Sequence, residues 1–324
     1  MTCVDRLCQE TIPRRQFLTA VAATGLGELV TCQQRSVAAA PAQRLTFSFG
    51  TYGSRTLSLE KSIRLVATIG YDGVEIATRP EWDAAPERMP KARRKEVHAL
   101  LLDRNLKVTA MMEHLPPSTD ARTHQNDLAR LRSVMELGTD LAPTAPPLIQ
   151  TVLGGGTWEE KKHLFVERVG DWSALAKEMQ TIVAIKPHRG GAMSRPSEAA
   201  WLIKQLGKTP WIRMVYDYSH YAFRNLSVEE TVRTALPFTA HIAVKDTIKT
   251  DTGFRFVLPG ASQAFDYAQL FKLFFAGGFR GDVCCEVSGM VWNTPDYDPV
   301  AAAKQCYQNL APCFETAGVP RPAS

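Results

Sequence analysis

Eight short apolar runs alternate with longer helical segments along the chain from residue 44 onward. Each run has five or six residues and is rich in Val, Ile, Phe or Ala, as are parallel strands that are buried on both faces. Eight strand–helix repeats without an intervening linker close more naturally as a barrel than as an open sheet. The sequence therefore predicts an α/β fold, a (β/α)8 TIM barrel that forms a single domain over residues 41–324. The expected strands are 45–49, 73–77, 107–112, 148–153, 182–186, 212–217, 241–245 and 282–287.

Composition excludes several classes of protein. The chain has 324 residues, of which 45% are hydrophobic and 22% charged, and these values are not those of disordered, collagen-like or multi-span membrane proteins. The 38 Lys and Arg against 33 Asp and Glu give a formal charge of +5. Because the charge is spread along the chain, we expect no nucleic-acid partner. The short basic run 93–95 is interpreted as a solvated helix face.

The first forty residues differ in kind from the rest. Arg14 and Arg15 precede an uncharged apolar stretch that ends at Leu26, and small residues follow at 36–40. This order is typical of a Tat-type signal peptide, so we expect residues 1–40 to direct export and to be removed, leaving a periplasmic protein. The apolar stretch is too short to span a bilayer. The alternative is a chance basic pair before a core helix.

The cysteines do not form a recognisable metal-binding pattern. Cys32 follows Thr31, where a lipidation signal requires Gly or Ala, so we do not expect a lipoprotein. The four cysteines beyond the leader have no C-x-x-C pair and no zinc-site spacing. Cys284 and Cys285 are adjacent on a predicted strand and therefore point to opposite faces, which suits small core residues. A disulfide in the exported protein is an alternative.

Ionisable residues gather at the ends of the predicted strands. The carboxyl ends of barrel strands are where such folds place their chemistry, and burial of even one unpaired charge costs several kcal/mol. The pattern therefore favours a functional pocket over a structural ion network. The residues are Glu75, Glu113, His114, Lys186, His188, Asp217, His220, His241, Lys245, Asp246 and Glu286.

Some of these residues also have simpler interpretations. Lys245 and Asp246 could form a salt bridge at the barrel rim. His114 and His188 could cap neighbouring loops, and Glu75 could bind a hydroxyl or a backbone amide.

Four segments together resemble a known superfamily. Their order is similar to that of the xylose-isomerase-like TIM barrels, which include sugar-phosphate isomerases and epimerases, tagatose-type epimerases and endonuclease IV. The resemblance covers roughly residues 44–318. The segments are Tyr71-Asp72-Gly73-Val74-Glu75-Ile76, Asp217-x-x-His220, Val244-Lys245-Asp246 and Glu286.

The resemblance implies a divalent metal site, from which this chain departs. The family's ligands are a Glu, an Asp, a His and a Glu on strands five to eight, and only Asp217 and Glu286 match. Lys186 and Ala243 stand at the other two positions, so we expect the Lys186 ammonium to supply positive charge in place of Mn, Mg, Zn or Co. The alternative is a rearranged metal site that uses Asp217, Glu286 and one of three histidines, His188, His220 or His241.

The resemblance also implies the chemistry. Family members remove a proton next to a sugar carbonyl and stabilise the enediolate that results, which requires a base, an acid and an electrophile. We assign the base to Glu286, the oxygen-binding electrophile to Lys186 or a metal, and proton shuttling to His188 and His220. The expected sugar-binding residues are Glu75, His114, His241, Lys245 and Asp246.

Three functions therefore stay open. The first is a sugar isomerase or epimerase that acts on a small-molecule sugar. The second is a 3-keto-glycoside lyase or hydrolase that uses the same first step, which export favours because sugar phosphates are scarce outside the cytoplasm. The third is a sugar-binding barrel without catalysis. An endonuclease would need more His and acidic ligands than this chain offers.

Overall fold

The computed structural model describes residues 44–322. Contacts divide the chain into a unit of residues 1–40 and a unit of residues 41–324, and only the second is described below. The predicted signal peptide lies outside the described residues. Across residues 44–322, no helix combines the length and apolar character needed to cross a membrane.

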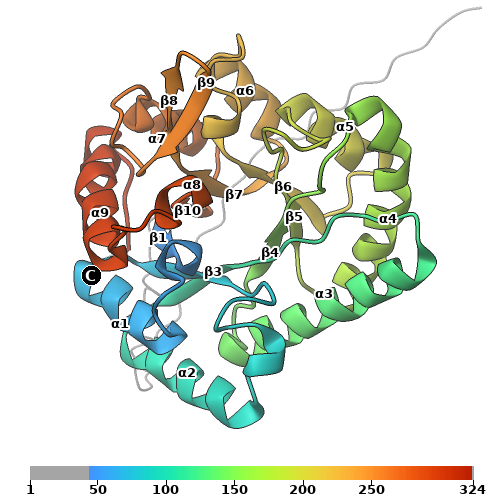
Figure 1. The fold of residues 1–324 in the computed structure, drawn as a ribbon, viewed down its shortest axis with the longest axis horizontal. Coiled ribbons are helices and arrows are strands. Elements are labelled where there is room, and N and C mark those ends of the chain that lie inside the picture. Colours follow the sequence, from blue (N-terminus) through green and yellow to red (C-terminus); the bar gives the residue numbers. More distant parts are fainter. Residues whose placement is uncertain (1–43, 323–324) are drawn as a thin grey trace, which may run out of the picture. The chain divides into compact units, whose positions relative to one another are not determined.

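Eight parallel strands form a closed barrel, which confirms the predicted fold (Figure 1). The first strand pairs with both the second and the last, which closes the sheet. Each predicted strand is found within two residues of its expected ends. The barrel strands are β1 (Thr46–Gly50), β2 (Gly73–Ala77), β3 (Lys107–Met112), β4 (Leu148–Thr151), β5 (Val183–Ile185), β6 (Ile212–Tyr216), β7 (Thr239–Val244) and β10 (Asp282–Cys285).

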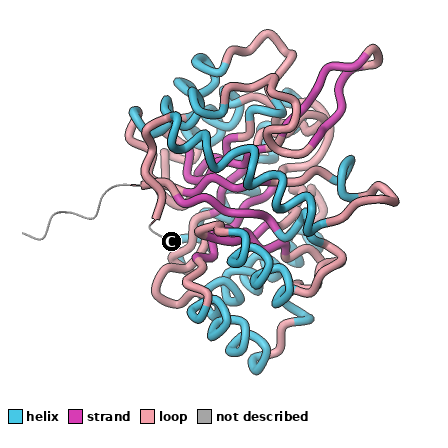
Figure 2. Tube along the Cα trace, turned by 90° about the vertical axis from the view of Figure 1, so that its left-hand side faces the viewer, coloured by secondary structure: helices cyan, strands magenta, loops and turns pink. Residues whose placement is uncertain are grey.

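Helices surround the barrel, as the views along and across it show (Figures 1 and 2). Ser227 caps one of them, because its hydroxyl accepts a hydrogen bond from the Glu230 amide. At Thr157, before α4, the hydroxyl instead donates to the Glu160 carboxylate and caps no backbone amide. The outer helices are α1 (Leu59–Ile69), α2 (Lys91–Asp103), α3 (Ala121–Leu141), α4 (Trp158–Glu178), α5 (Pro196–Gln205), α6 (Val228–Ala235), α7 (Tyr267–Ala276) and α9 (Pro299–Thr316).

The main hydrophobic core lies between the barrel and the helices. Large side chains such as Phe47, Trp172 and Phe274 are fully buried there. The apolar cluster inside the barrel is much smaller and consists of Ala184, Val215 and Ala243, with Leu148 packed against it. The small residues leave room in the barrel interior for longer polar side chains near the carboxyl ends of the strands.

An antiparallel hairpin that the sequence did not predict follows β7. It consists of β8 (Asp246–Thr250) and β9 (Gly253–Val257) and projects from the barrel (Figure 2). Asp246 begins the hairpin, and its carboxylate accepts hydrogen bonds from the Thr247 and Ser262 amides. The rim salt bridge considered for Lys245 and Asp246 is therefore wrong, because backbone amides satisfy the Asp246 carboxylate.

Candidate active site

Four charged side chains meet at the carboxyl end of the barrel. We call Lys186, Asp217, Lys245 and Glu286 the charged quartet; each directly follows its strand, β5, β6, β7 or β10. The backbone amides of Lys186 and Glu286 still donate to neighbouring strands, at 2.9 Å each. The parallel ladder thus holds these residues at one level, where alternation along each strand turns their side chains inward.

Both ammonium groups of the quartet contact both carboxylates. Lys186 Nζ donates to Glu286 Oε2 and lies 3.8 Å from Asp217 Oδ2. Lys245 Nζ lies 2.6 Å from Glu286 Oε1 and 3.3 Å from Asp217 Oδ2. All four side chains are at most 7% exposed. Two positive and two negative charges cancel, which makes their joint burial tolerable.

The quartet fixes the protonation states of its members. Burial alone raises the pKa of the Glu286 carboxyl, but Lys186 and Lys245 outweigh burial and lower that pKa to about 2. Burial likewise opposes ionisation of Asp217, yet Lys245 and other neighbours hold its pKa well below the usual range. Burial lowers the pKa of Lys186, and the carboxylates more than reverse that effect. Lys186 is therefore a cation and a hydrogen-bond donor, and not a neutral amine nucleophile.

The family's usual metal does not fit these residues. Ala243 offers no ligand atom, and the Lys186 ammonium lies against Glu286 where a cation would have to bind. Lys245 approaches the same two carboxylates from a second side. A divalent ion between them would meet two positive charges at close range. The two ammonium groups thus lie where an ion held by Asp217 and Glu286 would have to bind.

Two histidines that were predicted as proton shuttles lie beside the quartet. Their ring centres are 4.0 Å apart. His220 is fully buried; its Nδ1 accepts from the Arg189 amide at 3.2 Å, and its Nε2 lies 3.3 Å from Asp217 Oδ2. That arrangement places the proton of the neutral ring on Nε2, toward Asp217. Of the two, only His188 lines the cavity described below.

Both imidazoles are neutral at pH 7. Burial, reinforced by His220, Lys245 and Lys186, lowers the pKa of His188 to about 2. Burial and Lys245 lower the pKa of His220 to about 4, although Asp217 opposes that change. A neutral imidazole can donate and accept a hydrogen bond at the same time, which suits a proton relay.

A cavity of about 270 Å³ opens above Lys186 and Glu286. Its size is near the lower end of the range for small-molecule sites. The sequence had placed His114 at this edge of the barrel, and the structure places it in the cavity wall. The lining residues are Tyr52, Arg79, Met112, Glu113, His114, Gln150, Thr151, Val152, Lys186, His188 and Glu286.

Aromatic side chains that the sequence analysis missed gather around Tyr52, which lines this cavity. Tyr52 stacks on Trp82 with ring centres 5.1 Å apart, and Trp292 meets both edge-on. The Arg79 guanidinium lies 5.0 Å from the Trp82 ring. We call Tyr52, Trp82 and Trp292 the aromatic wall. Flat apolar rings beside a polar pocket suit a ligand that has both apolar faces and hydroxyl groups.

The β8–β9 hairpin also reaches the site. Phe256 packs against His220 at 5.5 Å and lies 4.9 Å from the Lys245 ammonium. Phe254 lies 4.2 Å from the Arg189 guanidinium. The Phe256 ring therefore covers Lys245 and reduces the contact of the quartet with water, which strengthens the ion pairs.

The remaining predicted residues are divided between different places. Glu113 lines the cavity but accepts a hydrogen bond from Arg130 at 2.9 Å. Glu75 and His241 lie close together, 3.2 Å apart at their nearest atoms, and neither lines the cavity. Asp246 is fully buried and bound to backbone amides, away from the cavity lining.

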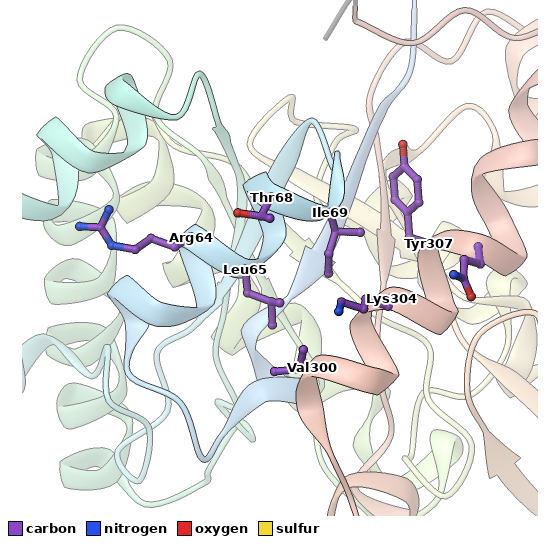
Figure 3. A pocket seen from close by; sticks show the side chains of 8 residues that line it. Arg64, Leu65, Thr68, Ile69, Val300, Lys304 and Tyr307 are labelled. Atoms are coloured by element: carbon purple, nitrogen blue, oxygen red, sulfur yellow. The ribbon is translucent and has the colours of Figure 1, made fainter.

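A second cavity, of about 430 Å³, lies between α1 and α9 (Figure 3). Leu65, Ile69 and Val300 supply apolar lining, and Arg64 and Lys304 supply charge. These residues belong to the outer helical layer. The cavity is therefore separate from the strand ends and from the charged quartet.

A comparison with family models decides the family. The model for the xylose isomerase-like TIM barrel matches residues 63–310. The chain belongs to this family. Among curated proteins, none matches the sequence significantly.

Solved structures share the fold at low sequence identity. The 3-keto-D-glucoside 4-epimerase from E. coli is 14% identical, with a TM-score of 0.65 over 83% of this chain and 100% of that one. The D-psicose 3-epimerase with D-tagatose from Clostridium cellulolyticum H10 is 14% identical, with a TM-score of 0.66 over 84% and 99%. The IOLI protein with a zinc atom is 17% identical, with a TM-score of 0.69 over 85% and 98%. At these identities the likeness establishes the fold alone.

Proposed function

We propose that the chain is a sugar isomerase or epimerase-type enzyme that removes a proton next to a sugar carbonyl. The observation that carries the proposal is Glu286, an ionised carboxylate in the cavity wall that two ammonium groups contact. A base and a positively charged donor at one point are what enediolate formation requires. Family membership supports the same class of reaction.

Substrate binding would raise the basicity of Glu286. In the free protein, Lys186 and Lys245 hold the pKa of this carboxyl at about 2, which makes it a weak base. A carbonyl oxygen that accepts a hydrogen bond from Lys186 draws the ammonium away from Glu286. The carboxylate then takes the proton from the neighbouring carbon, and the negative charge that develops on the oxygen is stabilised by the same lysine.

His188 would complete the proton transfers. Its neutral ring lines the cavity and can donate to one sugar oxygen while it accepts from another. Return of the proton to the adjacent carbon gives an isomer, and return to the opposite face of the same carbon gives an epimer. His220 and Asp217 would act as positioning residues, since Asp217 orients His220 and contacts Lys245.

The test is exchange of the substrate's carbon-bound hydrogen with deuterated water. Keto-sugars, including 3-keto-glucosides, would be incubated with the protein and followed by NMR. Glu286→Gln should reduce the exchange rate by ~100-fold or more, because the amide cannot accept the proton. The control is Glu87→Gln, the same change at an exposed carboxylate that contacts Arg130 and does not line the cavity. Near-normal exchange in a folded Glu286→Gln protein would place the base elsewhere.

A second candidate is a 3-keto-glycoside lyase. It shares the first step, after which the enediolate expels a β-leaving group. The aromatic wall favours it, because Tyr52 belongs both to the wall and to the cavity lining and could stack on the leaving ring or aglycone. Release of the aglycone would identify the lyase, and exchange without release the isomerase or epimerase. Saturable binding without exchange would identify a sugar-binding barrel.

We also propose that the protein is exported by the Tat route and acts in the periplasm. The support is the order of twin arginine, short apolar stretch and small residues at the start of the chain. Unphosphorylated sugars and glycosides are the substrates that this location would supply.

A further inference from the structure

Three potential metal ligands converge inside the barrel. Glu75 comes from β2, His241 from β7 and Cys284 from β10. One ligand atom of each lies within 4.8 Å of the others, and the three residues are at most 1% exposed. These positions differ from the family's metal ligands: His241 and Cys284 each stand two residues before the position where the family places a ligand.

Several polar atoms of this cluster have no hydrogen-bond partner within the described chain. They are Glu75 Oε1 and both ring nitrogens of His241. A buried polar atom without a partner costs about 1–3 kcal/mol, and such atoms rarely gather at one place without a ligand. His241 Nε2 and Glu75 Oε2 are 3.2 Å apart, but that contact leaves Glu75 Oε1 and His241 Nδ1 without partners.

Two neighbouring residues, Gln150 and Gly50, orient the Glu75 carboxylate and leave space beside it. Gln150 Nε2 donates to Glu75 Oε2 at 2.5 Å, which fixes the Glu75 side chain from the cavity side. At Gly50, a Cβ atom would lie 3.1 Å from Glu75 Oε1 and 3.7 Å from Cys284 Sγ. Because Gly50 has no side chain, the space between β1 and the atoms Glu75 Oε1 and Cys284 Sγ stays open. An outer hydrogen bond to a ligating carboxylate is a common feature of metal sites.

The charges favour a divalent cation. Lys186 and Lys245 form ion pairs with Asp217 and Glu286, and neither of them forms an ion pair with Glu75, which feels the Lys186 charge only from a distance. The two positive charges of a divalent ion would be balanced by the negative charges of one carboxylate and one thiolate. A thiolate, an imidazole and a carboxylate together are ligands that zinc prefers over magnesium or manganese.

We propose that Glu75, His241 and Cys284 bind one Zn²⁺ ion inside the barrel, beneath the charged quartet. Tetrahedral zinc ligands lie about 3.5 Å from one another, so small side-chain rotations would close the cluster around the ion. Three protein ligands leave a fourth position for water or Gln150. This site shares no residue with the proposed proton transfer by Glu286, Lys186 and His188.

The test measures the metal itself on the full chain, purified without chelators or a metal-binding tag. We expect one zinc per chain by elemental analysis, and a cobalt-substituted protein with a thiolate-to-cobalt charge-transfer band. Cys284→Ser should abolish the band and weaken zinc binding by at least 100-fold. The control is Cys285→Ser, an equally buried neighbour on the outer face of the strand, which should retain both.

Three results would overturn the inference. The first is the finding that the unmodified protein binds neither zinc nor cobalt tightly. This measurement does not depend on whether any variant folds. The second is an unchanged cobalt band in both Cys284→Ser and His241→Gln. The third is loss of the metal on Asp217→Asn with retention in Cys284→Ser, which would place the ion in the charged quartet. None of these outcomes depends on turnover, so they are distinct from failure of the proposed reaction.

Discussion

The Lys186 ammonium donates to Glu286 across the mouth of the barrel, from the strand position where the family resemblance implies a metal-binding glutamate. Compared with the ligand set that the resemblance implies, the chain has a cation in place of one carboxylate and Ala243 in place of the histidine. The positive charge at this point of the barrel then comes from two lysine side chains of the protein and not from a bound metal ion. Stabilisation of a negatively charged substrate oxygen would depend on where these lysines lie.

Loss of Lys186 should damage stability and binding together. In Lys186→Met, Asp217 and Glu286 share only Lys245, so we expect the pKa of one carboxyl to rise and sugar binding to weaken. Breaking a buried ion pair from one side costs about 3–5 kcal/mol, measurable by urea unfolding. Lys162→Met is the control, because Lys162 pairs with Glu159 on the surface of α4, where the Glu159 side chain is 75% exposed, and its loss should change stability little. Equal losses in the two variants would contradict the role of the quartet.

Much of this site could be predicted from the sequence. The strands are short, apolar and evenly repeated, so their number and ends followed from pattern alone. Parallel strands in a barrel align their carboxyl ends, and alternation places every second residue inside. Lys186, Asp217, Lys245 and Glu286 could therefore be assigned to one level without any structure.

The other parts of the site depend on the paths of the loops, which the sequence pattern does not predict. Tyr52, Trp82 and Trp292 follow three different strands, and only the paths of those loops bring the rings together. The hairpin after β7 has a signal that the sequence analysis did not use, because Phe254, Arg255 and Phe256 alternate after a short turn that ends at Gly253. The role of Asp246 depends on that hairpin and on the Ser262 amide beyond it.

Acid should destabilise the protein through His220. Its folded pKa of about 4 lies below the ordinary value of 6.5, so between these values the unfolded chain binds more protons than the folded chain. The contribution of His220 to the free energy of unfolding should therefore be complete above pH 6.5 and should decrease as the pH drops toward 4. Urea unfolding across this range should show a shallower fall in His220→Gln. The exposed His163→Gln should keep the natural slope, and an unchanged slope in both would mean that His220 titrates normally.

The aromatic wall should discriminate between glycosides and free sugars. Trp292→Ala removes a half-buried ring that meets Tyr52 and Trp82 edge-on. We expect the affinity for an aryl or disaccharide 3-keto-glycoside to fall about 10-fold, equivalent to ~1.4 kcal/mol, with little change for a monosaccharide. Calorimetric titration measures both. Trp201→Ala, in the outer helices beside Trp158, should change neither, and parallel losses for both ligands would argue against stacking.

Export should require both arginines of the leader. Because a twin-arginine signal depends on Arg14 and Arg15, replacement of both with Lys should leave the precursor in the cytoplasm. Cell fractionation and immunoblotting would show this, with Arg6→Lys as the matched control. N-terminal sequencing of the exported protein should find its first residue near positions 39–42. Unchanged export of the double variant would remove the Tat assignment.

Restoring the two absent ligands should create the family's metal site. Lys186→Glu with Ala243→His supplies a glutamate, an aspartate, a histidine and a glutamate around one point, and removes the ammonium that lies against Glu286. We expect the double variant to bind one Mn²⁺, an ion that prefers oxygen and imidazole ligands and has little affinity for a thiolate site. Each single variant is a control: Lys186→Glu lacks the imidazole, and Ala243→His retains the ammonium. Paramagnetic resonance titration should show tight Mn²⁺ binding in the double variant alone. Equal Mn²⁺ binding by the natural protein would mean that Lys186 yields to an ion, and the quartet would then be the unloaded form of a metal site.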